Sequence, residues 1–313
     1  MIRKARRNAL TDFITITAAV IGISVLILGL LALVRALYEP YVLDNSHVDM
    51  DSPDISAADI STGGASAGDT SASFAGESTV PALEAVFFTD LHAALCRVSD
   101  KRLMDAVFSS PCDVILFGGD VSNHGKAKDK GFSRLALLAA RASDLNIPCY
   151  AIRGNHDTTI RSAEYDKSGF ILLENRNVPV HGRSGYSYLL SGLDDTGKEN
   201  RSWPELPADY IGDFPIDRRI VLVHNPDYIF SSKNIRYRYQ LSGHFHGGQI
   251  YMPFDLEYRL FRGEQLASEG IHKGLFTKND IRGYISRGVG CVVIPLRLFS
   301  KPQVTHLTFR VKP

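Results

Sequence analysis

Short apolar runs recur along the chain, and residues of metal-binding types follow them. One such run, Val114–Phe117, leads into two glycines and Asp120. Because the run contains no polar residue, it predicts a central strand that is buried on both faces. The glycines allow a tight turn and leave room beside the acid. In open α/β sheets, ligands bind just beyond the carboxyl ends of strands, so this turn is a candidate site.

Four more apolar runs end in the same way. The residues at their carboxyl ends are Asp90 and His92, Asn155 and His156, His224, and His244 and His246. Taken one at a time, such short motifs are usually turns, helix caps or half-buried strand pairs. Their order and their shared position after apolar strands predict that they meet at one site.

Two stretches have the spacing of amphipathic helices. Ser99 can cap the first, in which Leu103–Phe108 contributes an apolar face, and the second covers about Lys130–Leu145. Beyond Gly169 the pattern changes to shorter strands joined by turns. An alternating βαβ start followed by a strand-rich second half predicts an α/β fold of two packed mixed β-sheets flanked by helices.

The amino-terminal part of the chain has a different pattern. Basic residues in Met1–Arg7 precede an uncharged, apolar stretch from Phe13 to Val34. At about 1.5 Å per residue, this stretch can span a hydrocarbon core of ~30 Å. It is longer than the apolar core of a secretory signal, usually ~7–15 residues, and no Ala-x-Ala cleavage site follows. Residues 1–37 therefore predict one transmembrane anchor, and the Arg6-Arg7 pair loosely matches a twin-arginine export signal.

The distribution of basic residues predicts the orientation of this anchor. After Arg35, no basic residue occurs until Arg97. The positive-inside rule then places the amino terminus in the cytoplasm and the folded domain outside it. Residues 38–79, rich in Ser, Ala, Gly and Asp, predict a flexible linker, although Tyr38–Leu43 is apolar enough to dock on the domain. The folded domain is expected to cover residues 80–313.

Composition narrows the function classes. The chain has 313 residues, 44% of them hydrophobic, and a net charge of +1, which gives no electrostatic case for binding nucleic acid. Its four cysteines lack the paired spacing of a zinc cluster. Cys112 and Cys149 begin neighbouring apolar runs and could pair, but we favour buried free thiols for all four.

The residues at the strand ends are suited to a pair of divalent cations. Asp90 and His92 can hold one cation, and Asp120 can offer it one oxygen and a second cation the other. A bridging carboxylate of this kind holds two ions ~3.5–4 Å apart. Oxygen and nitrogen ligands without thiolate suit Mn, Fe, Zn, Ni or Co. The remaining ligands would be Asn155, His224, His244 and His246.

The motifs TDLH, GGDVSN, GNHD, VHNP and GHFHGGQI, in this order over about Glu84–Ile250, resemble the five signatures of calcineurin-like metallophosphoesterases. The closing stretches SRGVGCVVIPLRLF and KPQVTHLTF, together with Tyr38-Glu39-Pro40, resemble the membrane-anchored bacterial branch of that family. This branch is related to UDP-2,3-diacylglucosamine pyrophosphatases of lipid A biosynthesis. The resemblance implies an αββα sandwich that hydrolyses a phosphomonoester, phosphodiester or pyrophosphate.

The resemblance also assigns roles by position. It gives Asp90, His92, Asp120 and His246 to the first metal, and Asp120, Asn155, His224 and His244 to the second. A water or hydroxide between the metals would attack phosphorus, and His156 would face the leaving group as a proton donor or charge stabiliser. Many phosphoprotein phosphatases have an acid three residues after the bridging aspartate. Asn123 stands there in this chain, next to His124, and cannot stabilise an imidazolium as a carboxylate can.

Several functions stay open at this point. An anchor suits a lipid-linked phosphate ester, but it suits any other envelope substrate too. A UDP-2,3-diacylglucosamine diphosphatase would work on the cytoplasmic side, in conflict with the predicted topology, to which we give more weight. A catalytically silent metal-binding module and a phosphodiesterase or nuclease are the alternatives. The segment Tyr251–Arg262 mixes aromatics with arginines and is either plain scaffold or a wall for an acyl or sugar-phosphate group.

Overall fold

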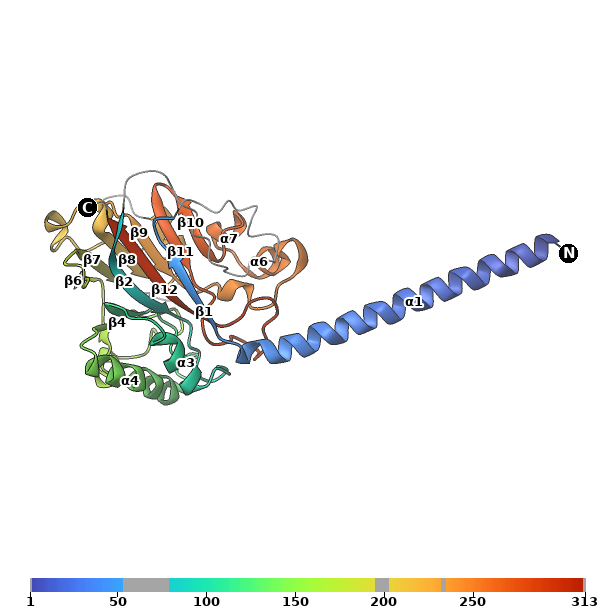
Figure 1. The fold of residues 1–313 in the computed structure, drawn as a ribbon, viewed down its shortest axis with the longest axis horizontal. Coiled ribbons are helices and arrows are strands. Elements are labelled where there is room, and N and C mark those ends of the chain that lie inside the picture. The colour runs from blue at the N-terminus through green and yellow to red at the C-terminus, as the bar shows by residue number, and fades with distance from the viewer. Residues whose placement is uncertain (1, 53–78, 195–202, 232–234, 312–313) are drawn as a thin grey trace.

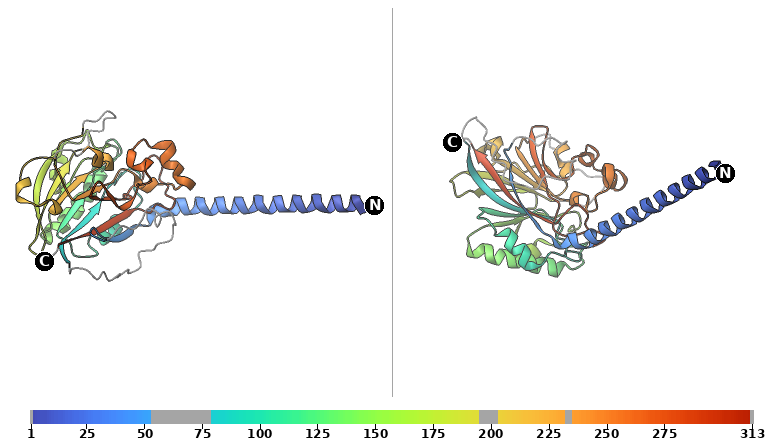
Figure 2. Two further views of the ribbon diagram at one scale, coloured as in Figure 1. Left: turned by 90° about the horizontal axis from the view of Figure 1, so that it is seen from above. Right: turned by 45° about the vertical axis from the view of Figure 1, so that its right-hand side comes forward.

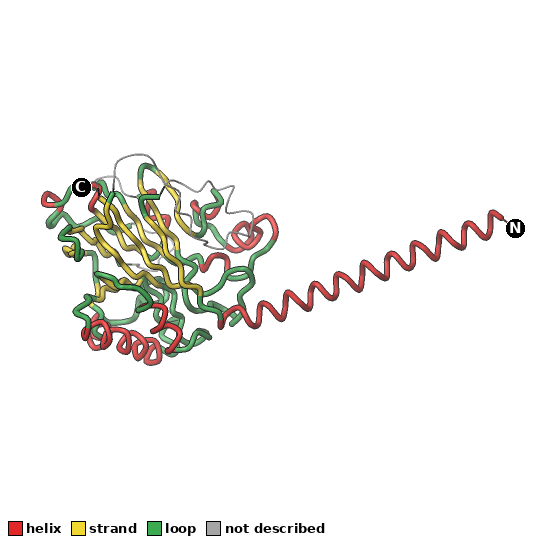
Figure 3. The backbone as a smooth tube through the Cα atoms, in the orientation of Figure 1, coloured by secondary structure: helices red, strands yellow, loops and turns green. Residues whose placement is uncertain are grey.

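The computed structural model describes residues 2–52, 79–194, 203–231 and 235–311. A single long helix, α1 (Ile2–Tyr38), extends away from a domain that contains all the described strands (Figure 1). The strands occupy the middle of the domain, and helices lie at its margins (Figure 3). The architecture is therefore a layered α/β domain with a protruding helix.

The first sheet has the strand order β1-β12-β2-β3-β4-β5. From β2 to β5 all neighbours are parallel, while β12 is antiparallel to β2 and parallel to β1. The sheet is thus mixed, as predicted. Its strands are β1 (Asp44–Asp49), β12 (Gln303–Val311), β2 (Val80–Phe88), β3 (Val114–Phe117), β4 (Cys149–Ala151) and β5 (Ile171–Leu172).

The second sheet has the order β10-β11-β9-β8-β7-β6. Its inner strands run parallel, and the edge strands β10 and β6 pair antiparallel with their neighbours. The prediction of two mixed sheets is confirmed. The strands are β10 (Gly274–Lys278), β11 (Ile281–Ile285), β9 (Tyr239–Ser242), β8 (Arg219–Val223), β7 (Ser187–Leu193) and β6 (Arg176–His181).

The apolar strand β3 shows how the layers are held together. Its alternate residues point to opposite faces, as strand geometry requires. Val114 and Leu116 pack in the core between the two sheets, whereas Ile115 and Phe117 pack in the core beneath the helices. These helices are α3 (Asp100–Val107), α4 (Lys128–Asp144) and α5 (Ser162–Ser168). Burial on both faces explains why this strand carries no polar side chain.

A third core lies on the outer face of the second sheet. Short helical segments cover it: the 3-10 helix η4 (Pro226–Phe230), α6 (Leu256–Phe261) and α7 (Gln265–Ser268). The two sheets thus form the inner layers, with α-helices on one side and shorter helical segments on the other. The remaining described segments are the 3-10 helices η1 (Glu39–Tyr41), η2 (Ile211–Asp213), η3 (Ile216–Arg218), η5 (His246–Gly248) and η6 (Pro253–Asp255).

The prediction of a flexible linker over residues 38–79 is wrong at its start. Asp44–Asp49 forms the edge strand β1, which pairs with β12, and Met50 after it is buried. A polar segment can join a sheet edge because backbone hydrogen bonds do not depend on its side chains. Glu39 and Pro40 are buried as well. Residues 53–78 of the predicted linker lie outside the described residues.

Helix α1 is exposed over its apolar stretch. The segment Thr11–Tyr41 is long and apolar enough to cross a membrane, and none of its most apolar window is buried against the domain. Figure 2 shows the same projecting helix from two further directions. The cysteines fit the prediction of free thiols: Cys96, Cys112, Cys149 and Cys291 are all buried and unbridged.

Candidate metal centre

The polar strand ends of both sheets converge. Asp90 and His92 follow β2, Asp120 follows β3, and Asn155 and His156 follow β4 of the first sheet. His224 follows β8 and His244 and His246 follow β9 of the second sheet. Since these strands are parallel within each sheet, their carboxyl ends lie at one edge. The sites predicted from five separate motifs therefore lie where the two sheets meet.

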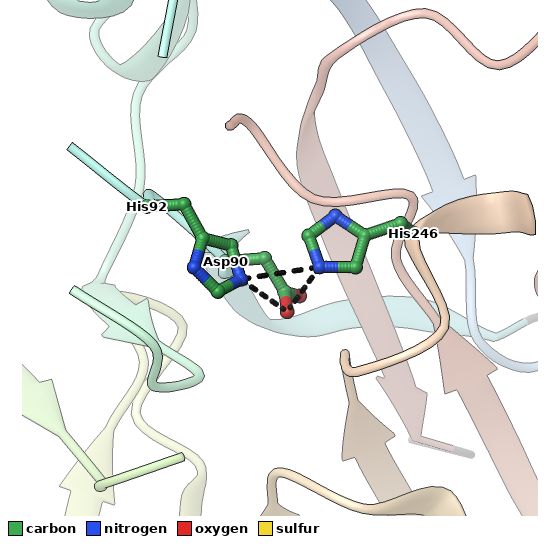
Figure 4. A group of neighbouring side chains, drawn as sticks. All are labelled: Asp90, His92 and His246. Carbon is green, nitrogen blue, oxygen red and sulfur yellow. Dashed lines mark hydrogen bonds and ion pairs between the residues drawn. The ribbon is translucent and has the colours of Figure 1, made fainter. Parts of the chain in front are cut away.

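Asp90, His92 and His246 form one compact group (Figure 4). The Nε2 atoms of His92 and His246 are 3.2 Å apart. His246 Nε2 lies 3.3 Å and His92 Nε2 3.8 Å from Asp90 Oδ1. All three residues are buried, and the Asp90 Oδ1 atom has no hydrogen-bond partner among the described residues. Buried polar atoms are normally satisfied, so this oxygen fits a cation ligand.

Asp90, Asp120 and His224 form a second group that shares Asp90 with the first. His224 Nε2 is 3.2 Å from Asp120 Oδ2 and 3.9 Å from Asp90 Oδ1. The Nδ1 atom of His224 lies 2.8 Å from the carbonyl oxygen of Gly118, which fixes the ring with Nε2 toward the carboxylates. Two adjoining groups of this composition fit two divalent cations, and the donor types do not select among Mn, Fe, Zn, Ni and Co.

Asp120 is the predicted bridging carboxylate, with one oxygen expected for each cation. Only Oδ2 faces both groups, at 3.4 Å from His92 Nε2 and 3.2 Å from His224 Nε2. The Oδ1 atom instead accepts a hydrogen bond of 2.9 Å from the backbone N–H of His156. This approach requires Gly154, because a Cβ there would lie 2.1 Å from Asp120 Oδ1. The loop after β4 therefore holds one oxygen and leaves the other for metal.

Electrostatics hold Asp90 and His246 in the forms that can bind a cation. Burial alone would raise the pKa of the Asp90 carboxyl, but His246, His92 and His224 outweigh it and hold this pKa well below its usual value. Burial lowers the pKa of His246 well below its usual value. Asp90 is therefore an anion and His246 a neutral imidazole at neutral pH. Buried carboxylates of this kind need a cation or hydrogen-bond donors nearby.

Asn155 and His244 meet beside the second group. Asn155 Oδ1 lies 3.0 Å from His244 Nδ1, and His244 Nε2 lies 2.8 Å from Glu264 Oε1. Arg262 Nη2 donates to the His244 carbonyl oxygen at 2.9 Å. Burial raises the pKa of Glu264, but the hydrogen bond and charge of His244 outweigh burial and lower it to about 2. The sequence reasoning missed Glu264, because no strand or motif marks it.

His156 lies at the edge of the centre. Its ring centroid is 5.0 Å from that of His92 and 4.0 Å from that of His124, and its Nδ1 atom has no hydrogen-bond partner among the described residues. Burial lowers the pKa of His156 to about 4. The imidazole is therefore neutral at pH 7 and can donate an N–H hydrogen bond, which favours the charge-stabilising role over that of a cationic acid.

The carboxylate of Asp157, next to His156 in the sequence, holds loops together rather than orienting the His156 ring. Asp157 is buried and accepts hydrogen bonds from the Val121 N–H at 3.0 Å and the Tyr165 hydroxyl at 3.1 Å. Burial raises its pKa to about 7. Asn123, which stands where many phosphoprotein phosphatases have an acid, has an Oδ1 atom without a hydrogen-bond partner among the described residues. Asp157 thus ties the loop after β3 to the loop after β4.

Comparison with known proteins agrees with this geometry. Residues 84–248 match the model of the family described as calcineurin-like phosphoesterase, which is more than half of the chain. The chain belongs to the calcineurin-like phosphoesterase family. The metallophosphoesterase YkoQ of Bacillus subtilis is 30% identical over 236 residues, covering 71% of this chain and 82% of that one. The phosphodiesterase YaeI of Escherichia coli is 28% identical over 253 residues, covering 75% and 84%.

Other relatives carry the same family name. The metallophosphoesterase YkuE of Bacillus subtilis is 28% identical, over 72% of this chain and 78% of its own. Among solved structures, the crystal structure of TT1561 of Thermus thermophilus aligns with 66% of this chain and 90% of that one at 14% identity and a TM-score of 0.37. That likeness is too weak to support a functional conclusion.

As a calcineurin-like phosphoesterase with this set of donors, the protein is a metal-dependent hydrolase of phosphoric ester bonds. The family match and the two ligand groups agree on two divalent cations. The roles of individual residues, His156 above all, stay predictions.

Proposed function

We propose that this calcineurin-like phosphoesterase is a membrane-anchored phosphodiesterase of the cell envelope. The observation that carries the proposal is the pair of adjoining ligand groups around Asp90 and Asp120, built by both sheets. The name of the relative YaeI supports a phosphodiester as the bond that is cleaved. The apolar helix α1 supports anchoring, with residues 1–37 as the anchor.

The residues of the metal centre have separate proposed roles. We propose that Asp90, His92, Asp120 and His246 hold one cation, and Asp120, Asn155, His224 and His244 the other. Bound metals would neutralise phosphate oxygens and lower the pKa of an attacking water. Asp120 is oriented by the His156 backbone N–H, at 2.9 Å from its Oδ1 atom. The neutral imidazole of His156 donates a hydrogen bond to the departing oxygen.

The anchor narrows the location of the substrate. We propose that the amino terminus is cytoplasmic and the catalytic domain extracytoplasmic, on the distribution of basic residues around α1. A lipid-linked phosphodiester on the outer side then suits the protein. A diphosphatase acting on UDP-2,3-diacylglucosamine would need the opposite orientation. A reporter that is active only outside the cytoplasm, fused to the carboxyl terminus, tests this orientation. An inactive fusion in intact cells contradicts the proposal and favours UDP-2,3-diacylglucosamine as the substrate.

The activity is tested with the full chain in detergent, loaded with Mn²⁺ and given bis-p-nitrophenyl phosphate. We expect the wild type to hydrolyse this substrate. We expect Asp120→Asn to abolish both hydrolysis and metal binding at the site that Asp120 is proposed to bridge. His156→Ala keeps metal but lowers kcat by about 100- to 1,000-fold, the usual cost of losing one hydrogen-bond donor that stabilises developing charge. Asp105→Asn, at an exposed position of α3, is the matched control and leaves turnover unchanged.

Three outcomes contradict the assignment in different ways. A metal-loaded wild type that hydrolyses no phosphodiester points to a silent metal-binding module. His156→Ala turnover equal to wild type removes the proposed role of that residue. Nicking of plasmid DNA by the wild type, absent in Asp120→Asn, points to a nuclease instead.

A further inference from the structure

Exposed apolar side chains gather at the end of the domain from which α1 departs. The two most exposed are Phe254 and Val293, at 80% and 85%. We call this surface the apolar patch, and it consists of Tyr251, Phe254, Leu260, Val293, Ile294 and Phe299. Figures 1 and 2 show α6, which carries Leu260, at this end of the domain in every view. Exposed apolar side chains that lie close together commonly mark a protein or membrane contact.

Hydrogen bonds hold the two main segments of the patch side by side. The Tyr251 N–H donates to the carbonyl oxygen of Leu298 at 2.9 Å, and the Tyr251 ring lies 6.1 Å from the Phe299 ring. The side-chain amide of Gln249 donates to the carbonyl oxygens of Val292 and Ile294, at 2.9 and 3.1 Å. The loop after β9 and the loop before β12 therefore present their apolar side chains together.

The backbone of the patch is held in an unfavourable conformation. Phe254, Val293 and Phe299 have φ values of 61°, 64° and 57°. Left-handed φ is uncommon for residues with a side chain and is a marked outlier for a β-branched residue such as valine. Strain of this kind persists where the surrounding structure maintains it, and it concentrates at functional sites. Here it accompanies bulky apolar side chains exposed to solvent.

The patch is continuous with the base of α1. The Arg297 N–H donates to the Ala36 carbonyl oxygen at 3.1 Å, and the Ser300 N–H donates to the buried Glu39 carboxylate. The Arg35 guanidinium lies 4.1 Å from the centre of the Phe299 ring. Since both loop and helix are tied at these points, the patch has a fixed position beside the helix end.

We propose that the apolar patch lies in the headgroup region of the bilayer that α1 enters, an inference that rests on the membrane anchoring proposed above. Three exposed basic residues near patch residues suit anionic headgroups: Arg35, Arg259 and Lys301. Aromatic side chains such as Tyr251 and Phe299 are suited to the membrane interface. The domain thus rests on the lipid surface, with α1 as its pivot.

This contact places the metal centre near the lipid. Ser300, next to Phe299 of the patch, donates its hydroxyl to the carbonyl oxygen of His246 at 2.7 Å. One hydrogen bond therefore separates the patch from the backbone of a proposed metal ligand. The substrate class that fits is a phosphodiester presented at headgroup level, as in a phospholipid or lipid-linked polymer.

The test measures the depth of fluorescent probes in the full chain reconstituted into phosphatidylethanolamine and phosphatidylglycerol vesicles. Val293→Cys and Phe254→Cys carry an environment-sensitive dye, and the native cysteines are too buried to react. Leu137→Cys, at an apolar position of α4 that is 50% exposed, is the matched control. Leu26→Cys reports on the anchor itself. Spin-labelled lipid headgroups quench only probes at the membrane surface, and acyl-chain labels quench deeper ones.

We expect headgroup labels to quench the Val293 and Phe254 probes and shift their emission to the blue, with no change at Leu137. Acyl-chain labels quench the Leu26 probe. If the Leu26 probe is quenched and both patch probes are not, the proposed patch contact is wrong while the anchor stands. A blue shift of the patch probes without quenching means that protein covers the patch, and it overturns the inference likewise. If Leu26 itself is not quenched, the proposed anchoring fails and the patch contact with it.

Discussion

At the scale of single residues, the proposed ligands have an uncommon backbone conformation. Five of them have positive φ values: Asp90 at 53°, His92 at 38°, Asp120 at 60°, His244 at 71° and His246 at 54°. Left-handed conformations cost energy for residues with a Cβ atom, and asparagine, aspartate and histidine tolerate them best. Strained turns at strand ends aim these side chains at one point. The metal centre therefore stores conformational strain that packing around it must offset.

Glu264 is a positioning residue by this geometry. Its carboxylate lies 2.8 Å from His244 Nε2 and so orients the ring with Nδ1 toward Asn155. We expect Glu264→Gln to weaken metal binding about 10–100-fold, the usual effect of removing a carboxylate that orients a ligating histidine. Metal titration by calorimetry, and kcat at saturating Mn²⁺, measure the effect.

The matched control for this variant is Glu269→Gln, because Glu269 pairs with Lys278 and not with a histidine. Its metal affinity should equal that of the wild type. Equal affinity of Glu264→Gln and wild type would show that Glu264 does not position His244.

At the scale of elements, strand β3 links the site to both cores. Its residues alternate between the core of the two sheets and the core beneath the helices, and Asp120 follows it within one tight turn. Gly119 in that turn has a φ of 95°, and a Cβ there would lie 2.4 Å from the Gly154 nitrogen. The turn therefore packs directly on the loop after β4, which carries Asn155.

Removing side-chain volume from β3 should destabilise the whole domain. Ile115 is completely buried beneath the helices, so Ile115→Ala should lower the free energy of unfolding by about 2–5 kcal/mol. Denaturation by urea, followed by circular dichroism, measures this loss. Leu137→Ala, at a half-exposed position of α4, should change the free energy by less than about 0.5 kcal/mol. Similar losses in both variants would contradict the layered core.

At the scale of the whole molecule, the metal centre joins the two sheets. Asp90, His92 and Asp120 come from the first sheet, and His224 and His246 from the second. Without cations, two buried carboxylates of the first sheet, those of Asp90 and Asp120, lie within 4.8 Å of each other at this junction, which is unfavourable. Bound cations should therefore stabilise the packing of one sheet on the other.

Metal removal tests this at the level of the fold. We expect Mn²⁺ at 100 times its dissociation constant to stabilise the folded state by ~2.7 kcal/mol per site, and EDTA to remove that gain. Thermal unfolding of the full chain in detergent, with either reagent, measures the change as a shift in Tm. Asp120→Asn should show a smaller shift than the wild type. A Tm that does not respond to Mn²⁺ in the wild type would contradict a centre that joins the sheets.

Local sequence patterns were sufficient to predict much of the fold and of the metal centre. The apolar runs predicted the strands, and the polar residues after them predicted where ligands gather, because parallel strands place their carboxyl ends along one edge. Helical spacing after Ser99 predicted α3, and the Ser99 hydroxyl indeed accepts a hydrogen bond from the Arg102 N–H at 3.3 Å. The five motifs, in order, were enough to indicate the family and its two cations.

Contacts between distant parts of the chain decided the rest. The orientation of the Asp120 carboxylate depends on the loop after β4. Glu264 reaches His244 from a segment without any motif, and β1 exists because β12 offers an edge. The docking of α1 likewise depends on Arg297 and Ser300, far along the chain. Periodicity and residue type report on a segment's own preferences, whereas these features come from partners that only folding brings within hydrogen-bond reach.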